Sequence, residues 1–300
     1  MFELTPKSDL AIISSVMSIY KETTDDRKTG IRDAEFANWQ KSIQHLPSLT
    51  TKELTSDLVN ISVCHEGQIV PFSQFPGNIV GLGYQFNLEL TGMPRSAKTA
   101  AMEYINYQLR SNNIPRGIAR EPRPDFNVDN DPYDYNLWMG LNSGTDLLRL
   151  KHQDICGVTI FDRGPHNFIP YKAAAKTLEA NRFSKKFFYP NFPRWIDLGL
   201  IADIGVYIDS LFIFHCTPET SLSRGSTMSQ KFLGELARRY LELPKIINRL
   251  RVDSQAPKDH FDPLFIAEFD ANSDLGLIHD LTIKTMGTII SKYAPILKES

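Results

Sequence analysis

The sequence predicts a three-layer α/β fold, in which a mostly parallel sheet of about five strands is covered by helices on both faces. From residue 84 onward, short apolar runs typical of buried strands alternate with longer segments of helical periodicity. This alternation favours parallel strands joined by helical crossovers. The candidate strands are 84–91, 116–120, 155–161, 210–216 and 263–270, and the candidate helices are 99–111, 135–152, 168–182, 195–208, 229–250 and 274–294.

The first 80 residues have a different pattern and are expected to form a helical N-terminal extension, separate from a main domain at 81–300. Apolar residues recur at helical spacing near residues 10–20 and 31–46, and Thr50 or Thr51 can cap a short third helix. A stretch rich in proline and glycine, 68–83, separates the two parts. Since no catalytic spacing occurs here, the extension is expected to pack on the main domain. The alternative is a partner-binding, homodimer-forming or autoregulatory surface.

The composition is that of an ordinary globular protein, with 42% hydrophobic and 23% charged residues and a formal net charge of -2. This balance gives no electrostatic indication of nucleic-acid or anionic-membrane binding. Cys64, Cys156 and Cys216 lie far apart and form no paired metal-binding motif. Buried, reduced thiols are expected at Cys156 and Cys216, which lie in or beside apolar runs.

Neither a secretory signal nor a membrane span is expected. The N-terminus has an early acidic residue and lacks the basic-then-apolar pattern of a signal peptide. The most apolar window, 198–216, is interrupted by Asp203 and Asp209, well short of a membrane span. A cytoplasmic protein without a membrane partner is therefore expected.

A phosphate-binding loop is predicted directly after the first candidate strand. The pattern G-x-x-x-x-G-K-[ST] is matched, with alanine in place of the second glycine, by Gly92, Met93, Pro94, Arg95, Ser96, Ala97, Lys98 and Thr99. In such a loop, backbone N–H groups and the helix N-terminus bind phosphate oxygens. Lys98 would contact the β- and γ-phosphates, and Thr99 would bind Mg²⁺. The expected ligands are ATP or GTP as phosphate donor and Mg²⁺ as cofactor.

The other candidate strands end in charged residues as well. Glu121 follows 116–120, Asp162 and Arg163 follow 155–161, and Arg224 lies about two turns after 210–216. Because parallel strands with right-handed crossovers end at one edge of the sheet, these residues are expected at a common site. Carboxylates and cations beside a phosphate loop are the groups that phosphoryl transfer requires for positioning and charge neutralisation.

Four segments in order carry a family resemblance. After the loop come Glu121-Pro122, then DRGP at 162–165, PETSLSR at 218–224, and the helix FLGELARRYLEL at 232–243. Over roughly residues 84–295, this set resembles the thymidylate kinase and deoxynucleoside kinase group of P-loop kinases, including the nicotinamide-riboside-kinase-like branch. The resemblance implies a P-loop NTPase fold and a kinase acting on a small-molecule acceptor.

The resemblance also implies roles for individual residues. Glu121 would be the general base or a ligand of metal-bound water, and Asp162 would hold Mg²⁺ or share the role of base. Arg163 would bind the acceptor side, and Arg224 would be the lid arginine that neutralises charge on the transferred group. An aromatic residue stacked on the acceptor base would be Trp138, or alternatively Phe126.

Three positions depart from the family pattern. Ala97 replaces a glycine, which would cost about 1–2 kcal/mol if that position needs a left-handed backbone. The lid segment, RGSTMSQKF, has one arginine where active relatives commonly have two or more, and Lys231 or Arg238 would have to substitute. His166 and Asn167 follow the DRGP segment, where relatives often place an acidic residue.

Three functions are compatible with these features. The first is a kinase that transfers the γ-phosphate of ATP or GTP to a nucleoside, nucleotide or related hydroxyl, as the acceptor-side set Glu121, Arg163 and Trp138 favours. The second is a regulatory nucleotide-binding module with slow or absent hydrolysis, as Ala97 and the sparse lid favour. The third is a kinase acting on polynucleotide ends or another macromolecule.

Overall fold

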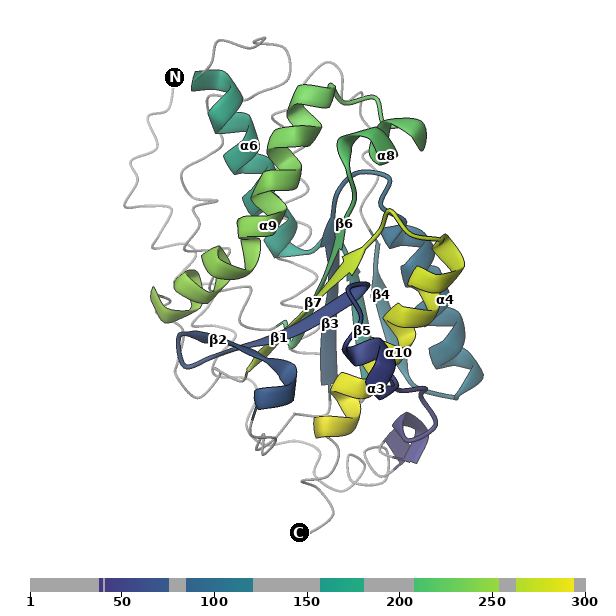
Figure 1. Cartoon of the computed structure of the whole chain (residues 1–300). Coiled ribbons are helices and arrows are strands. Elements are labelled where there is room, and N and C mark those ends of the chain that lie inside the picture. Colours follow the sequence, from purple (N-terminus) through teal and green to yellow (C-terminus); the bar gives the residue numbers. More distant parts are fainter. Residues whose placement is uncertain are drawn as a thin grey trace, which may run out of the picture.

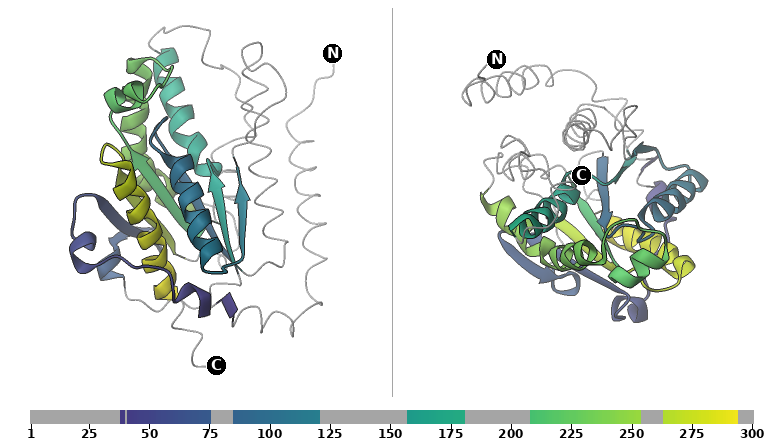
Figure 2. Two further views of the ribbon diagram at one scale, coloured as in Figure 1. Left: turned by 90° about the vertical axis from the view of Figure 1, so that its right-hand side faces the viewer. Right: turned by 90° about the horizontal axis from the view of Figure 1, so that it is seen from above.

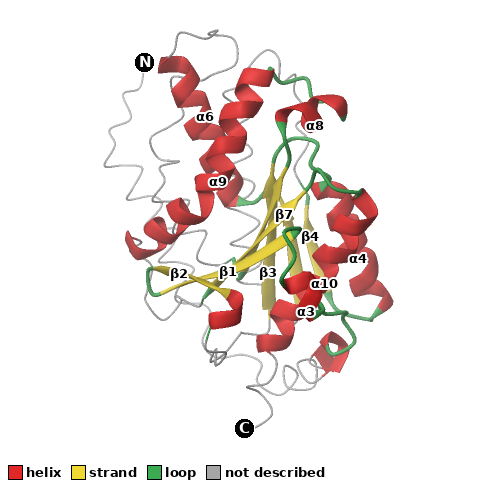
Figure 3. Ribbon diagram, viewed as in Figure 1, coloured by secondary structure: helices red, strands yellow, loops and turns green. Residues whose placement is uncertain are grey.

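A seven-stranded sheet lies between two layers of helices in the computed structural model (Figures 1 and 3). The structure describes residues 38–39, 41–75, 85–120, 157–180, 208–253 and 263–293. The strand order is β2-β1-β7-β6-β3-β5-β4. The fold is therefore the predicted three-layer α/β type with a mostly parallel sheet, but it has seven strands rather than about five.

The five predicted strands are all present and pair in parallel. They are β3 (Gln85–Gly92), β4 (Arg116–Ala119), β5 (Gly157–Asp162), β6 (Ser210–His215) and β7 (Leu264–Asp270). The strand before the phosphate loop, β3, is central and pairs with β5 on one side and β6 on the other. Residues after β3 and β5 therefore come together.

Four of the predicted helices cover this sheet. They are α4 (Lys98–Ser111), α6 (Phe168–Ala180), α9 (Gln230–Asp253) and α10 (Leu275–Tyr293). Helices α4 and α10 pack together on one face and α6 and α9 on the other, as the view from above in Figure 2 shows. The helices expected at 135–152 and 195–208 lie outside the described residues.

The two additional strands come from the N-terminal part of the chain. β1 (Val59–His65) pairs antiparallel with β7 on one side and with β2 (Gln68–Pro71) on the other. Glu66 and Gly67 join them with φ values of 48° and 77°, as in a type I′ hairpin turn. The helical description of the first 80 residues is therefore wrong for residues 59–71. Alternating and β-branched residues in VNISV were the missed signal.

The short helix expected near residue 50 is present. α3 (Thr51–Leu54) begins after Thr50, whose side chain accepts a hydrogen bond from the Glu53 N–H while the Glu53 carboxylate accepts from the Thr50 N–H. This is a capping box. Glu53 also pairs with Lys284 of α10 at 2.8 Å. The segment before β1 is thus attached to the helical layer.

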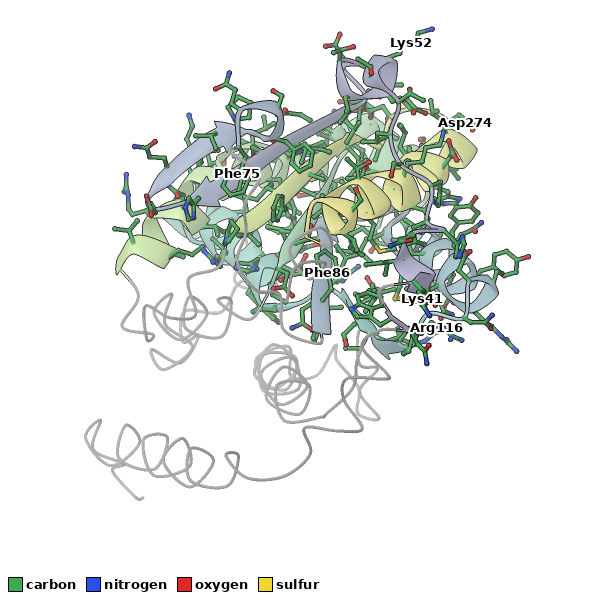
Figure 4. The ribbon with its side chains drawn as sticks, turned by 90° about the horizontal axis from the view of Figure 1, so that it is seen from below. Lys41, Lys52, Phe75, Phe86, Arg116 and Asp274 are labelled. Carbon is green, nitrogen blue, oxygen red and sulfur yellow. The ribbon has the colours of Figure 1, made fainter. Side chains whose placement is uncertain are left out.

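The central strand β3 is buried on both of its faces. Leu88 and Leu90 point to one face, while Glu89 and Thr91 point to the other, where Thr91 meets Tyr240 of α9. Figure 4 views the molecule from below and shows Phe86 within the body of the molecule, whereas Lys52 and Arg116 lie on its periphery. The charged residue of this strand, Glu89, is therefore enclosed by protein on every side.

Two cysteines belong to the described residues, and both are free and buried. Burial raises the pKa of the Cys64 thiol to about 12. The prediction of a buried thiol is confirmed for Cys216, while Cys156 lies outside the described residues. None of the helices that the structure describes combines the length and hydropathy needed to cross a membrane.

Candidate functional site

The phosphate loop begins where β3 meets the end of β6. Gly92 has a φ of 139°, and a Cβ atom there would lie 2.3 Å from the Phe214 carbonyl oxygen. The next N–H, of Met93, donates to that same oxygen at 3.1 Å. The first glycine of the motif is thus required by its backbone conformation and by the close approach of β6.

The loop then turns through two left-handed residues. Arg95 has a φ of 58° with an exposed side chain, and Ala97 has a φ of 70°. Ala97 is the N-cap of α4, and its carbonyl accepts the first helical hydrogen bond, from Ala101 at 2.9 Å. The left-handed backbone anticipated for Ala97 is therefore present, with its cost of about 1–2 kcal/mol.

Lys98 is buried within the loop that it follows. Its side chain is 4% exposed, and Nζ donates to the carbonyl oxygens of Gly92 and Met93 at 3.0 and 2.6 Å. The Ser96 hydroxyl lies 3.3 Å away. The buried ammonium thus hydrogen-bonds to three oxygens of the loop and closes the loop into a ring. A phosphate group could replace these oxygens as the partner of the ammonium.

The far side of the loop is attached to α8 (Pro218–Ser223), the short helix after β6. The buried Ser221 hydroxyl donates to the Pro94 carbonyl oxygen at 2.8 Å, and the Cys216 thiol lies 3.9 Å from the same oxygen. Strand β6, the residue that follows it and helix α8 thus all contact the loop backbone.

Arg224 lies at the same edge of the sheet. Burial raises the pKa of the Cys216 thiol, and the positive charges of Lys98 and Arg224 oppose that rise, so both cations lie near Cys216. The Arg224 guanidinium donates to the Ala271 carbonyl, just after β7, at 2.8 Å. It is thus held by the β7–α10 connection.

Asp162, the last residue of β5, joins the loop through Thr99. The Thr99 hydroxyl, in the first turn of α4, donates to Asp162 Oδ2 at 3.0 Å. The contact is possible because β3, which leads into the loop and α4, is the parallel neighbour of β5. The other carboxylate oxygen, Oδ1, is buried and accepts no hydrogen bond within the part of the chain that the structure describes. Such an oxygen is available to a ligand that brings positive charge.

Mg²⁺ fits this pair of residues. A hydroxyl and a carboxylate oxygen are hard ligands, and Mg²⁺ takes few of them because it retains water and binds substrate phosphates. Across the described ranges, no group of three histidine, cysteine or acidic side chains forms a metal site of the all-protein kind. The hydroxyl of Thr99 and the carboxylate of Asp162 therefore suit a cation that binds together with a nucleotide.

Arg163 continues from Asp162 into a tight turn. It has a φ of 64°, and its N–H donates to the Leu90 carbonyl at 3.0 Å. Gly164 follows, and a Cβ atom there would lie 2.7 Å from the Glu89 Cδ atom. The turn thus rests directly on a carboxylate of the central strand.

That carboxylate, Glu89, has no exposed surface and accepts three hydrogen bonds from the turn. The N–H groups of His166 and Asn167 donate to it at 3.4 and 3.1 Å, and His166 Nδ1 lies 2.8 Å from Oε2. A buried carboxylate is tolerated only with partners of this kind. Glu89 thereby fixes the backbone after Arg163.

Asn167 connects this turn to the start of the phosphate loop and to α9. Its Oδ1 accepts from the Thr91 hydroxyl at 2.9 Å and from the Tyr240 hydroxyl at 2.8 Å. Burial raises the pKa of Tyr240 well above its usual value, which keeps the phenol protonated as a donor. Asn167 thus links residues from three elements beneath the site.

The predicted residues divide into two groups. The structure brings together the Gly92–Thr99 loop, Asp162, Arg163 and Arg224 at one edge of the sheet. Glu121, Phe126 and Trp138 lie outside the described residues. Glu89 and Tyr240 were missed, although an acidic residue between two leucines of a strand was a usable sign of a buried polar contact.

Among the comparisons with known proteins, the one with solved structures finds similar proteins. No protein-family model matches the sequence, and no curated protein matches it. Two solved structures of deoxyadenosine kinase from M. mycoides are similar at 16% identity. The one with bound dATP has a TM-score of 0.44 and matches 66% of this chain and 97% of its own.

The second, with the products dCMP and a flexible dCDP bound, has a TM-score of 0.45 and matches 69% of this chain and 100% of its own.

Proposed function

We propose that the protein is a phosphotransferase that moves the γ-phosphate of ATP or GTP to a hydroxyl of a nucleoside, nucleotide or related small molecule. The observation that carries this proposal is the 3.0 Å contact between Thr99 and Asp162, beside the buried ammonium of Lys98. The contact joins the phosphate loop to a carboxylate whose other oxygen has no hydrogen-bond partner among the described residues and would be available to a bound cation.

The site residues would act by binding and charge neutralisation. Lys98 would exchange its carbonyl partners for β- and γ-phosphate oxygens, and the α4 N-terminus would contribute backbone N–H groups. Bound Mg²⁺, held by Thr99 and Asp162, would supply positive charge to the phosphate oxygens. Asp162 would also orient the acceptor hydroxyl or share the role of base.

Three arginines supply cations around this centre. Arg163 would bind the acceptor side and Arg224 would neutralise charge on the transferred group. Arg95 projects an exposed guanidinium from the phosphate loop itself and would compensate for the single lid arginine. On the acceptor side, the proposed residues are Glu121 as base and Trp138 or Phe126 as the stacking ring.

A regulatory nucleotide-binding protein is the second candidate, and the left-handed backbone of Ala97 favours it. Alanine at this position strains the loop against the helix N-terminus, where a small displacement would affect transfer more than binding. In that case residues 1–80 would bind a protein partner or a second copy of the chain.

The decisive experiment is a screen for transfer of radiolabelled γ-phosphate from Mg-ATP and Mg-GTP to nucleosides, nucleotides and oligonucleotide ends. We expect transfer to one small-molecule class, lost in Lys98→Ala together with nucleotide binding measured by calorimetry. Lys52→Ala, on the exposed surface of α3, is the matched control. Nucleotide binding without transfer to any acceptor would replace the kinase by the regulatory protein, and transfer only to oligonucleotides would identify a polynucleotide-end kinase.

A further inference from the structure

We infer that Glu89 is a positioning residue, which holds the Asp162–Arg163 turn in the conformation that phosphoryl transfer requires. The inference rests on the proposed function. Glu89 lies in the middle of the central strand, and its side chain is enclosed by the sheet and the turn after β5. It does not reach the edge of the sheet, so it acts through the backbone that it binds.

The contacts are concentrated on the segment directly after Arg163. His166 contributes both its N–H and its ring nitrogen, and Asn167 contributes its N–H. Gly164 packs against the same carboxylate too closely for a side chain. Glu89 thus lies against Gly164 and is hydrogen-bonded to His166 and Asn167, while Pro165 has no N–H to donate.

This attachment explains how Arg163 keeps a left-handed backbone. A non-glycine residue at a φ of 64° is unfavourable, and it persists where the surrounding contacts determine it. The turn is fixed on one side by the Arg163 N–H bond to Leu90 and on the other by Glu89. Loosening the second attachment would let the Arg163 backbone relax and displace its side chain.

The same network aligns the turn with the phosphate loop. Asn167 binds Glu89 through its N–H and Thr91 through its side chain, and Thr91 precedes Gly92. Two functional segments from different strands thus share one buried set of hydrogen bonds. Such an arrangement would hold the phosphate donor and the acceptor at a fixed separation. Transfer enzymes gain much of their rate from this positioning.

The chain offers a matched control in a second pair of the same kind. Glu268 of β7 and His215 of β6 contact each other at 3.0 Å, with side chains 22% and 21% exposed. Glu268 also accepts from Asn60 of β1. Glu268→Gln therefore changes a glutamate–histidine pair in the same sheet without touching the Asp162–Arg163 turn.

Two variants disturb the Glu89 contact from opposite sides. Glu89→Gln replaces the carboxylate by an amide of the same shape, which cannot accept all three bonds. Gly164→Ala keeps the carboxylate and pushes it with a methyl group, while the Gly164 φ of −73° is one that alanine adopts readily. If Glu89→Gln does not fold, Gly164→Ala tests the inference by itself.

The experiment measures kcat, the KM of the donor nucleotide and amide hydrogen exchange of residues 163–168. We expect both variants to lower kcat by about 10- to 100-fold with a donor KM within about twofold of wild type. Exchange at His166 and Asn167 should be faster, and Glu268→Gln should show neither change. Glu89→Asp, which keeps the charge, should recover part of the rate.

The inference is overturned if both variants match Glu268→Gln in kcat and in exchange. It is also overturned if kcat falls only in proportion to the folded fraction, because that is the result of a structural role alone. Should the wild-type protein transfer no phosphate to any acceptor, the proposed function fails. The exchange comparison then decides by itself whether Glu89 holds the turn.

Discussion

The phosphate loop and the turn after β5 each hold a non-glycine residue in a left-handed conformation, but they do so by different means. Ala97, with a φ of 70°, lies in a loop closed by its own Lys98. Arg163, with a φ of 64°, lies in a turn held by Glu89 of a neighbouring strand. The ammonium that closes the loop belongs to the loop motif itself, whereas the carboxylate that holds the turn comes from a strand far away in sequence. The sequence motifs therefore include Lys98 but not Glu89.

Among the variants of these two segments that keep the phosphate-binding lysine, the largest effect is expected from Asp162→Asn, which removes the negative charge at the contact with Thr99. The amide keeps the shape of the carboxylate but removes its charge, so transfer should fall by about 100- to 1,000-fold. Nucleotide affinity in the absence of Mg²⁺ should be unchanged, because Lys98 and the loop backbone remain. Transfer assays, with calorimetry in the presence and absence of Mg²⁺, measure both quantities.

Wild-type transfer in Asp162→Asn would remove this residue from the catalytic assignment. A loss of affinity without Mg²⁺ would indicate that Asp162 shapes the loop.

A medium effect is expected when Arg163 is replaced by either alanine or glycine. Both variants lose the guanidinium, so both should have the same reduced transfer rate. Only alanine keeps the left-handed strain, which costs about 1–2 kcal/mol and exceeds the entropic cost of glycine of about 0.5–1 kcal/mol. Arg163→Gly should therefore have the larger free energy of unfolding, by up to about 1.5 kcal/mol, in urea denaturation. Equal stabilities would mean that the turn does not strain Arg163.

The smallest effect is expected from Ala97→Gly, which restores the usual phosphate-loop pattern. The same balance of strain and entropy predicts a gain in the free energy of unfolding of at most about 1.5 kcal/mol, which corresponds to a rise in Tm of about 3–6 °C. Transfer should be equal or faster. Ala101→Gly, within α4, is the control and should lower the stability by about 1 kcal/mol. A lower Tm in Ala97→Gly would show that the loop does not strain its alanine.

Much of the fold was predictable because its signals are local. Each parallel strand is a short apolar run bounded by turn residues, and β3 to β7 all lie within a few residues of their predicted positions. The hairpin of β1 and β2 was missed, because proline and glycine near its end indicated a linker. Its place in the sheet depends on β7, about 200 residues later in the chain.

The placement of the candidate site residues was predictable to the same extent. Lys98, Thr99 and Asp162 are recognisable because loop and strand-end patterns define them. Glu89 is not, because its partners His166 and Asn167 lie 77 and 78 residues further along. The Arg224 contact with the Ala271 carbonyl likewise joins two connections that no local pattern relates.

The β1–β2 hairpin also determines where the chain can be shortened. β1 pairs along most of β7, so a protein that began at residue 81 would expose the backbone N–H and C=O groups of an apolar strand. Unpaired strands of this kind recruit further chains and aggregate. Among the described residues, the outermost strand at this edge is instead β2, four mostly exposed residues ending in Pro71, which cannot donate a hydrogen bond. The N-terminal hairpin thus ends the growth of the sheet.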